Sequence, residues 1–498
     1  MIRTFIFGIS SLSSGVVIPP GESSLLAATV SKNRYGAAMT FNQNTDTLGT
    51  NRYPSEFWAW QHNIAATSFV SRYSGIDDAM NASGRVEKAI YFQTDRWYNP
   101  VSQAVELIPD YTATSWTSAG AAAFANAVVG QPKDTRYPNH GQQLYDISNG
   151  AYGYDAVSGI GDSNMQELSE LVEAEKSQYN EEPFVFSYRN GRNDSPSVYL
   201  PYFLGGRNSF FSTSGDSYTA YGAGAGLPNN DTARLDYVDR ASATRFADFE
   251  TGVTPLGIPA GGTYAESLVY LEQELLKTVD SNGFFQDFMH WHTAGTKVRD
   301  MYEKVAEVLA PYDVHYAGYD EALRYLWARE MVQAVTVSGN TVNLTWNSFD
   351  LPQALTVPVS IRIDVSGTAL AGKELQSSVG SILKKSANVF VVEVPYNTDS
   401  FTLSETAIPA YVDLAAPTIN YSVSGSTLTV TTNKPCRVVL WKHSRGGSDA
   451  SMPAPTRSNT LGTTHNFAVT STDLQGDLYI GAITERKQSA VIGPIQHS

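Results

Sequence analysis

The sequence predicts an α/β protein: a mixed α/β domain over residues 34–332, followed by two small β-sandwich modules at 333–410 and 411–498. In the first range, short apolar runs alternate with segments whose apolar residues recur every three to four positions. Such alternation favours parallel βα units, arranged as a barrel or a doubly wound sheet. After Met331 the apolar residues alternate with period two, as in antiparallel strands. A length of 498 residues agrees with about three domains.

Residues 1–33 are predicted to form an N-terminal strand and arm. The apolar start, 1–8, reads as a β-strand, and 9–32 is rich in Ser, Gly and Pro. The start resembles a signal peptide only faintly, because serines interrupt the apolar run and no clear cleavage site follows. An apolar strand leaves an edge that it cannot satisfy alone. We therefore expect 1–32 to pack against another chain or against the C-terminal modules.

Strands and helices follow in order along 34–332. Strand character is found in five runs: 36–41, 64–70, 88–94, 183–188 and 284–291. Helical spacing of apolar residues is found in four segments: 165–179, 264–279, 297–310 and 319–332. In the all-β part, Ala334–Trp346 is predicted to be a hairpin with a Ser-Gly-Asn turn, and Tyr421–Thr432 repeats that pattern.

The composition restricts the kinds of partner that the protein can bind. A net charge of −15 argues against a nucleic-acid or anionic-membrane surface, because both need clustered Lys and Arg. No stretch approaches the ~20 apolar residues of a membrane span. The 28 Tyr and 8 Trp are compatible with sugar-stacking surfaces as well as with ordinary core packing. A single cysteine, Cys436, excludes an intrachain disulfide and is read as a small buried hydrophobe.

Histidines are scarce, so their positions are informative. His290-Trp291-His292 closes an apolar run, and residues two apart on a strand project to the same face. Two imidazoles at the end of a βα-type strand lie where active sites form in barrels. The other interpretation is a pair of hydrogen-bonded structural histidines. His140 lies in a polar turn after an Ala-rich segment, and it becomes a candidate only if the fold brings it near His290.

The order of these segments resembles the polysaccharide deacetylase superfamily of carbohydrate esterases, whose fold is a distorted (β/α) barrel. The likeness covers residues 34–332. Its five motifs are Gly36–Gln43 for the first strand, Asn63–Val70 for the next strand, Asn139-His140-Gly, Phe186–Arg192 for a groove-lining loop, and Phe288-Met-His290 for the late histidine strand. Glu321 in the closing helix fits the family's ending.

The resemblance implies a metal-dependent deacetylation of a surface polysaccharide. It makes His290 a general acid, with His292 and Asp46 as further catalytic candidates. Asp46 and His140 would hold a divalent metal, zinc by preference. The substrate-binding candidates are Tyr188, Arg189, Arg192 and Trp291, with the two arginines facing anionic or acetylated sugar groups.

The sequence also departs from the family pattern. Asn42 and Gln43 stand where the family has its base and metal aspartates, and Leu144 stands where a second metal histidine is usual. Two hypotheses therefore remain open. One is a metal-dependent carbohydrate esterase. The other is a catalytically silent barrel that binds glycans or serves as a structural component of a phage virion or cell-surface appendage. Both place the protein outside the cell or on a virion surface, in a homo-oligomer or larger assembly.

Overall fold

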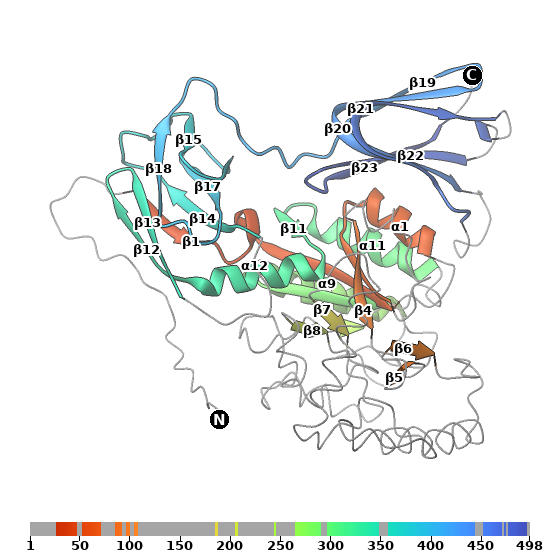
Figure 1. Ribbon diagram of the computed structural model, residues 1–498, viewed down its shortest axis with the longest axis horizontal. Coiled ribbons are helices and arrows are strands. Elements are labelled where there is room, and N and C mark those ends of the chain that lie inside the picture. The colour runs from red at the N-terminus through yellow and green to blue at the C-terminus, as the bar shows by residue number, and fades with distance from the viewer. Residues whose placement is uncertain are drawn as a thin grey trace, which may run out of the picture.

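The computed structural model describes fourteen segments of the chain. They are 26–46, 52–70, 85–91, 96–99, 104–107, 185–187, 205–207, 244–245, 264–289, 296–347, 357–443, 452–470, 473–474 and 477–495. None of the helices in these segments is long and apolar enough to cross a membrane. Figure 1 shows a central α/β part with two separate all-β modules above it.

A parallel sheet forms the centre of the α/β part. Its strands are β2 (Met39–Asp46), β3 (Ala66–Val70), β4 (Val86–Tyr91), β7 (Val185–Ser187), β8 (Gly205–Arg207), β9 (Thr244–Arg245), β10 (Phe284–Met289) and β11 (Val314–Tyr316). Their order is β8-β7-β4-β3-β2-β10-β9, and β11 pairs with the start of β2. Every pair in this sheet is parallel. A short antiparallel pair, β5 (Arg96–Asn99) with β6 (Ala104–Leu107), lies outside it.

Three helices pack on one face of the sheet. They are α1 (Arg52–Gln61), α9 (Tyr264–Ser281) and α11 (Thr296–Leu309). Leu271 and Leu275, one helical turn apart, bury against alternate strand residues such as Phe41 and Phe285. The helices expected over 264–279 and 297–310 are thus α9 and α11, whereas 165–179 lies outside the described residues.

The second face of the sheet carries polar side chains and is covered by the start of α12 (Tyr319–Met331). Because side chains alternate along a strand, Asn42 points away from the face that holds Phe41. The Asn42 amide donates to Thr67 Oγ1 at 3.1 Å, and that hydroxyl donates to Glu87 Oε2 at 2.8 Å. Tyr319 N also donates to Thr67 Oγ1, at 2.7 Å. This polar row therefore fixes the first turn of α12 to the sheet.

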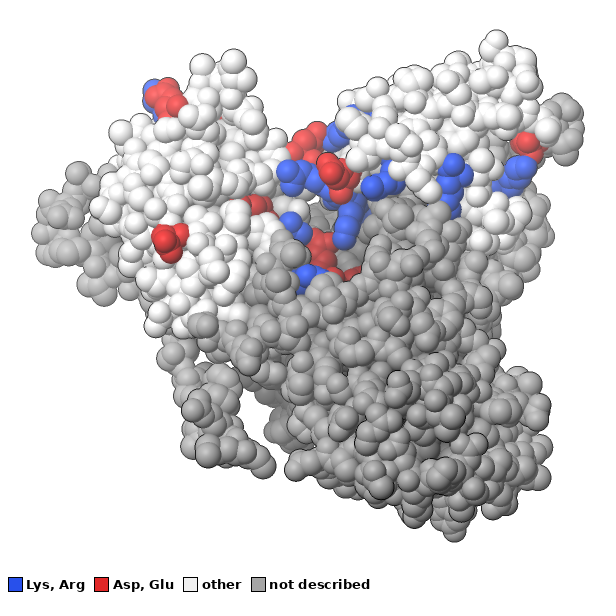
Figure 2. All heavy atoms as spheres, viewed as in Figure 1, with Lys and Arg blue, Asp and Glu red and all other residues white. Residues whose placement is uncertain are grey.

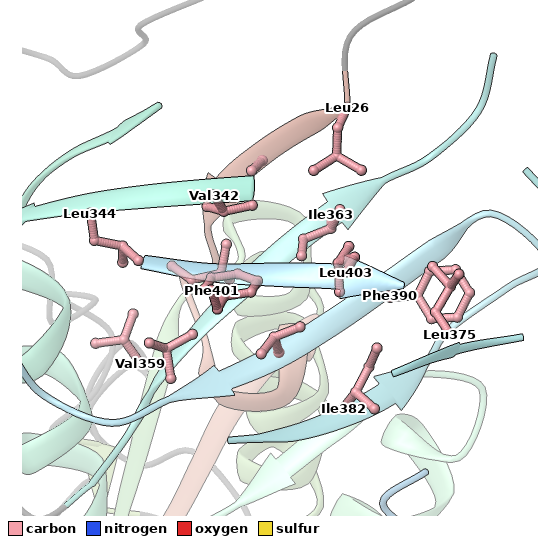
Figure 3. Packing of buried hydrophobic residues seen from close by; sticks show 14 of the residues in the cluster. Leu26, Val342, Leu344, Val359, Ile363, Leu375, Ile382, Phe390, Phe401 and Leu403 are labelled. Atoms are coloured by element: carbon pink, nitrogen blue, oxygen red, sulfur yellow. The ribbon is translucent and has the colours of Figure 1, made fainter. Parts of the chain in front are cut away.

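The first all-β module is a sandwich of two four-stranded sheets. One sheet has the order β12-β13-β18-β15, and the other has the order β1-β14-β17-β16. The bounds are β1 (Ala27–Val30), β12 (Val332–Ser338), β13 (Thr341–Trp346), β14 (Val359–Asp364), β15 (Leu375–Ser377), β16 (Ser381–Lys384), β17 (Val389–Val394) and β18 (Ser400–Glu405). Figure 3 shows the apolar side chains of both sheets meeting between them, with Phe390 and Phe401 among them.

The N-terminal arm completes this sandwich. β1 pairs antiparallel with β14, from Ala27 opposite Asp364 to Val30 opposite Ile361. Leu26 and Ala28 are buried in the sandwich core. The described part of the arm thus packs on a C-terminal module, one of the two arrangements expected from the sequence, while residues 1–25 lie outside the described segments.

The second all-β module is a five-stranded antiparallel sheet. It consists of β19 (Ile419–Ser424), β20 (Thr427–His443), β21 (Thr456–Ala468), β22 (Asp477–Thr484) and β23 (Ser489–Ile495). Alternate residues of β20 and β22 face opposite ways. Val438 and Ile480 fill the module's own core, whereas Trp441 and Ile483 pack on Phe57 and Trp60 of α1. The module is therefore docked on the α/β part through an apolar interface.

Both hairpins expected from the sequence are present. β12 and β13 are joined through Gly339, and β19 and β20 through Gly425, with φ of 59° and 57°. Glycine adopts this left-handed conformation without the steric cost that a side chain brings. Closure of the parallel strands into a barrel stays a prediction, since the described strands include no pair that closes the ring.

Candidate functional site

The edge where β2 and β10 end is the site that the sequence singles out. The two strands are parallel neighbours, and Met289 at the end of β10 lies opposite Thr45, one residue before Asp46. His290 follows Met289 directly in the sequence. Ligand sites in parallel sheets form at the carboxyl ends of the strands. The backbone register therefore brings the strand that leads to His290 level with the strand that ends in Asp46.

The other predicted site residues fall outside the described segments. These are His140, Tyr188, Arg189, Arg192, His290, Trp291 and His292. For the loop that begins at Tyr188, the structure gives the position of the preceding strand. β7 ends at Ser187 and reaches β2 through β4 and β3. In an open sheet with ~4.8 Å between strands, β7 and β10 would be about 19 Å apart, and barrel curvature would shorten this distance.

Asn42 and Gln43, which the resemblance to polysaccharide deacetylases aligns with aspartates of those enzymes, are both fully buried. Besides its bond to Thr67, the Asn42 amide donates to Ala317 O at 2.8 Å. Its two donor hydrogens thus hold the sheet and the segment before α12 together. Asn42 consequently has a structural role, and Asp46 is the only residue of β2 that can supply a carboxylate at this edge.

The described residues contain no group of three or more His, Cys, Asp or Glu side chains that could hold a metal ion. A metal at the β2–β10 edge would need Asp46 together with histidines from 140, 290 or 292. Carboxylate and imidazole are suitable zinc ligands, whereas an amide that is already hydrogen-bonded within the sheet is not. The donor set proposed from the sequence fits a zinc ion in its chemistry.

A second cluster, which the sequence does not predict, lies where the three parts of the chain meet. Its centre is Glu321 in the first turn of α12. Glu321 is ion-paired to Arg34, which precedes β2, and to Lys487 of the second all-β module, with Nζ–Oε2 at 3.0 Å. His315 Nε2 lies 3.2 Å from Glu321 Oε1. Glu321 thereby connects the start of the α/β part, β11 and the last hairpin.

The charges around Glu321 determine its ionisation. Burial alone would raise its pKa, but Lys487, the hydrogen bond with His315 and the charge of Arg34 together hold the pKa of Glu321 well below its usual range. Arg34 also donates through Nε to Glu393 Oε2 at 3.0 Å. Ser360 of β14 donates to the other oxygen of Glu393. A continuous chain of polar contacts therefore runs from the sandwich, through Arg34 and Glu321, to Lys487.

A second carboxyl group in this region, that of Glu87, has its pKa shifted upward rather than downward. Burial, reinforced by the neighbouring Asp320 carboxylate, raises the pKa of Glu87 to about 8. Glu87 accepts hydrogen bonds from Thr67 and from the backbone N–H of Asp320, at 3.1 Å for Oε1. Gly318 lies against it, and a Cβ at this position would be 2.3 Å from Glu87 Oε2. Glu87 therefore caps the start of α12 from the sheet side.

A pocket of about 560 Å³ opens beside this cluster. Its walls come from all three parts of the chain, and the lining residues are Arg34, Tyr35, Asp320, Glu321, Arg324, Val357, Pro358, Glu485, Arg486 and Lys487. Figure 2 shows Lys and Arg gathered with Asp and Glu around a hollow between the two all-β modules. We call this hollow the junction pocket. The partners in it are separated by up to about 450 residues in sequence, so no local pattern could have revealed it.

Comparison with known proteins gives no assignment: no protein-family model matches the chain, and no curated protein matches its sequence. Any function must therefore be inferred from the geometry of the two sites.

Proposed function

We propose that this protein processes or binds a surface polysaccharide at the edge where β2 and β10 end, in the manner of polysaccharide deacetylases. The observation that supports this is the register of the two strands, Thr45 opposite Met289. It brings Asp46 and the residue preceding His290 to the same edge of a parallel sheet. That is the arrangement which a carboxylate and an imidazole sharing one site require.

In the enzymatic form of the proposal, Asp46 and His140 would hold a divalent metal, zinc by preference. A bound zinc ion would polarise the acetyl carbonyl and activate water. His290 gives a proton to the leaving group, with His292 beside it. Tyr188, Arg189, Arg192 and Trp291 contact the sugar. The protein would work outside the cell or on a virion surface, within a homo-oligomer or larger assembly.

The second candidate is a catalytically silent domain that binds glycan or serves as a structural component of a phage virion or cell-surface appendage. The burial of Asn42 and Gln43 favours it. These amides hold the positions of the family's aspartates, and an amide can act neither as a general base nor as an equal substitute for a carboxylate ligand. Only Asp46 and the histidines would then be left to support turnover.

Acetate release from acetylated polysaccharides distinguishes the two candidates. The wild type, His290→Ala and Asp46→Asn are compared with and without a chelator. His62→Ala is the matched control, because His62 precedes β3 and so belongs to the opposite edge of the sheet. Chelator-sensitive release that both site variants abolish and the control retains supports the enzyme. Retained glycan binding without release under any divalent metal supports the silent domain. The absence of both glycan binding and acetate release overturns the proposal.

A further inference from the structure

The junction pocket has the features of a prepared binding site. Its charged walls are held in place before any ligand arrives, because Glu321 is fixed by Arg34, His315 and Lys487. Arg324 is fixed by Asp320, with Nε to Oδ2 at 2.9 Å. Preorganised groups reduce the entropy lost on binding. The pocket of about 560 Å³ is open to solvent and its lining is mostly polar, which suits a charged, hydrated group better than an apolar ligand.

The backbone at one wall is also strained. Tyr35 lines the pocket with a φ of 58°, which is uncommon for a residue with a side chain, and Gly36 follows with a φ of 65°. Tyr35 N donates to Ser360 Oγ at 2.8 Å, and its ring packs edge-on against His315. This unfavourable conformation places the Tyr35 side chain in the wall, and such strain is concentrated at functional sites.

Two donors in the pocket lack an acceptor. In the part of the chain that the structure describes, no hydrogen bond or ion pair reaches the Tyr35 hydroxyl or the Arg486 guanidinium. Tyr35 is 8% exposed, whereas Arg486 is exposed on the turn between β22 and β23, so water satisfies its donors until a ligand replaces that water. Burial raises the pKa of the Tyr35 hydroxyl, and the positive charges of Arg34 and Arg486 oppose this rise. At neutral pH the hydroxyl is therefore a donor that lies within the electrostatic field of Arg486.

The acidic residues of the wall leave room for an anion. Arg34 is shared between Glu321 and Glu393, Lys487 is paired with Glu321, and Arg324 is paired with Asp320. These charges cancel, so Arg486 is a cation left for an anion. Glu485 is exposed on the same turn as Arg486. Guanidinium, ammonium and neutral phenol groups are hydrogen-bond donors, and a carboxylate is the acceptor that matches a guanidinium in geometry and charge. Salt screens the overall negative charge of the protein beyond about 8 Å at physiological ionic strength, so the local groups decide binding.

We propose that the junction pocket binds the carboxylate of a small acidic ligand through Arg486, Tyr35 and Lys487, and that this ligand is a sugar-acid unit. Carboxylate binding is inferred from the pocket alone, whereas the identity of the ligand as a sugar acid rests on the proposed polysaccharide function. Because the pocket is built from all three parts of the chain, an occupied pocket also strengthens the attachment of the last hairpin to α12.

Calorimetric titration of the full chain with sodium glucuronate tests the proposal, with glucose as the neutral counterpart and acetate and sulfate as simple anions. Glucuronate should bind and glucose should not. Arg486→Gln should weaken binding about tenfold or more, as expected for loss of a charge-assisted hydrogen bond. Tyr35→Phe should weaken it less. Lys442→Gln is the matched control, since Lys442 is paired to Asp473 in the same module.

Absence of glucuronate binding, or binding that Arg486→Gln leaves unchanged, overturns the proposal. Acetate and sulfate binding as tightly as glucuronate overturns the sugar-acid part. These outcomes are independent of acetate release, because Asp46 ends β2, whereas Arg34 and Tyr35 of the pocket precede that strand. A failure of the deacetylation assay is thereby distinguished from a failure here.

Discussion

Arg457 of the second all-β module and Glu56 of α1 form a buried, bidentate ion pair. Nη1 lies 2.7 Å from Oε1, and Nη2 lies 2.7 Å from Oε2. The two side chains are 7% and 0% exposed. Glu56 precedes Phe57 on α1, and Arg457 lies on β21 in the sheet that carries Trp441. The pair therefore adjoins the apolar cluster of Phe57, Trp60 and Trp441. It adds an orientation-specific contact to an interface that apolar packing alone would leave less defined.

Arg457→Leu should destabilise the protein by roughly 3–5 kcal/mol, because it leaves the Glu56 carboxylate buried without its cation. The double variant Glu56→Leu/Arg457→Leu should recover much of this loss, since neither charge is then buried alone. Urea denaturation of the four proteins in this cycle gives the coupling energy. Equal stabilities for the single and double variants would contradict the ion pair seen here.

Gly481→Ala should destabilise the docked module by about 1–3 kcal/mol, the range for overpacking a core. A Cβ at Gly481 would be 2.2 Å from Trp441 Cζ3 and 3.1 Å from Trp60 Cε3, so both indoles would have to move. Gly462→Ala in the same module is the control, because its nearest neighbours would be 3.6 Å away. Thermal unfolding, followed by tryptophan fluorescence, should separate the two variants. The same melting temperature for both would exclude this packing.

Ala28→Asp should destabilise the sandwich by about 2 kcal/mol or more, since it buries a carboxylate in an apolar core. Ala28 is 6% exposed, whereas its neighbour Ala27 is exposed on the other side of β1. Thr29 is exposed on that same side and lies opposite Arg362, so the control Thr29→Asp should be tolerated. Comparing the unfolding free energies of these two variants tests whether β1 pairs with β14 in solution. A detached arm would make the two substitutions equivalent.

Glu87→Gln should change the pH dependence of stability. The folded-state pKa of Glu87, about 8, lies above the value of about 4.3 for an unfolded glutamate. Between these pH values the folded state holds a proton that the unfolded state has lost, so this residue makes the wild type less stable as pH rises. The stability of Glu87→Gln relative to the wild type should therefore increase from pH 5 to pH 8. A constant difference over this window would show that Glu87 is ionised throughout.

Local features of the fold could be predicted from the sequence. The period of apolar residues located α9, α11 and α12, and Gly339 and Gly425 marked the two hairpin turns. These features depend on residues only a few positions apart, for which periodicity and turn chemistry are direct physical signals.

The pairing of distant segments could not be predicted in this way. Arg34, Glu321 and Lys487 are ordinary surface-type residues in the sequence, and nothing near them indicates that they meet. β1 was expected to need a partner, yet the choice of β14 depends on the assembled sandwich. At the β2–β10 edge, the sequence indicated the strands and Asp46, while the tertiary hydrogen bonds of Asn42 explain why an amide is accommodated there.

The pairing of β1 with β14 has a consequence for the order in which the chain can fold during synthesis. Ala27 leaves the ribosome more than three hundred residues before its partner Asp364. The intervening α/β part can collapse around its own core in the meantime, whereas β1, an outer strand of its sandwich sheet, has no partner until β14 has been translated. Contacts of such long sequence separation form late and slowly. A nascent chain released before about residue 364 would thus carry an unpaired N-terminal strand, and recruitment of that strand by a neighbouring nascent chain would give a domain-swapped pair.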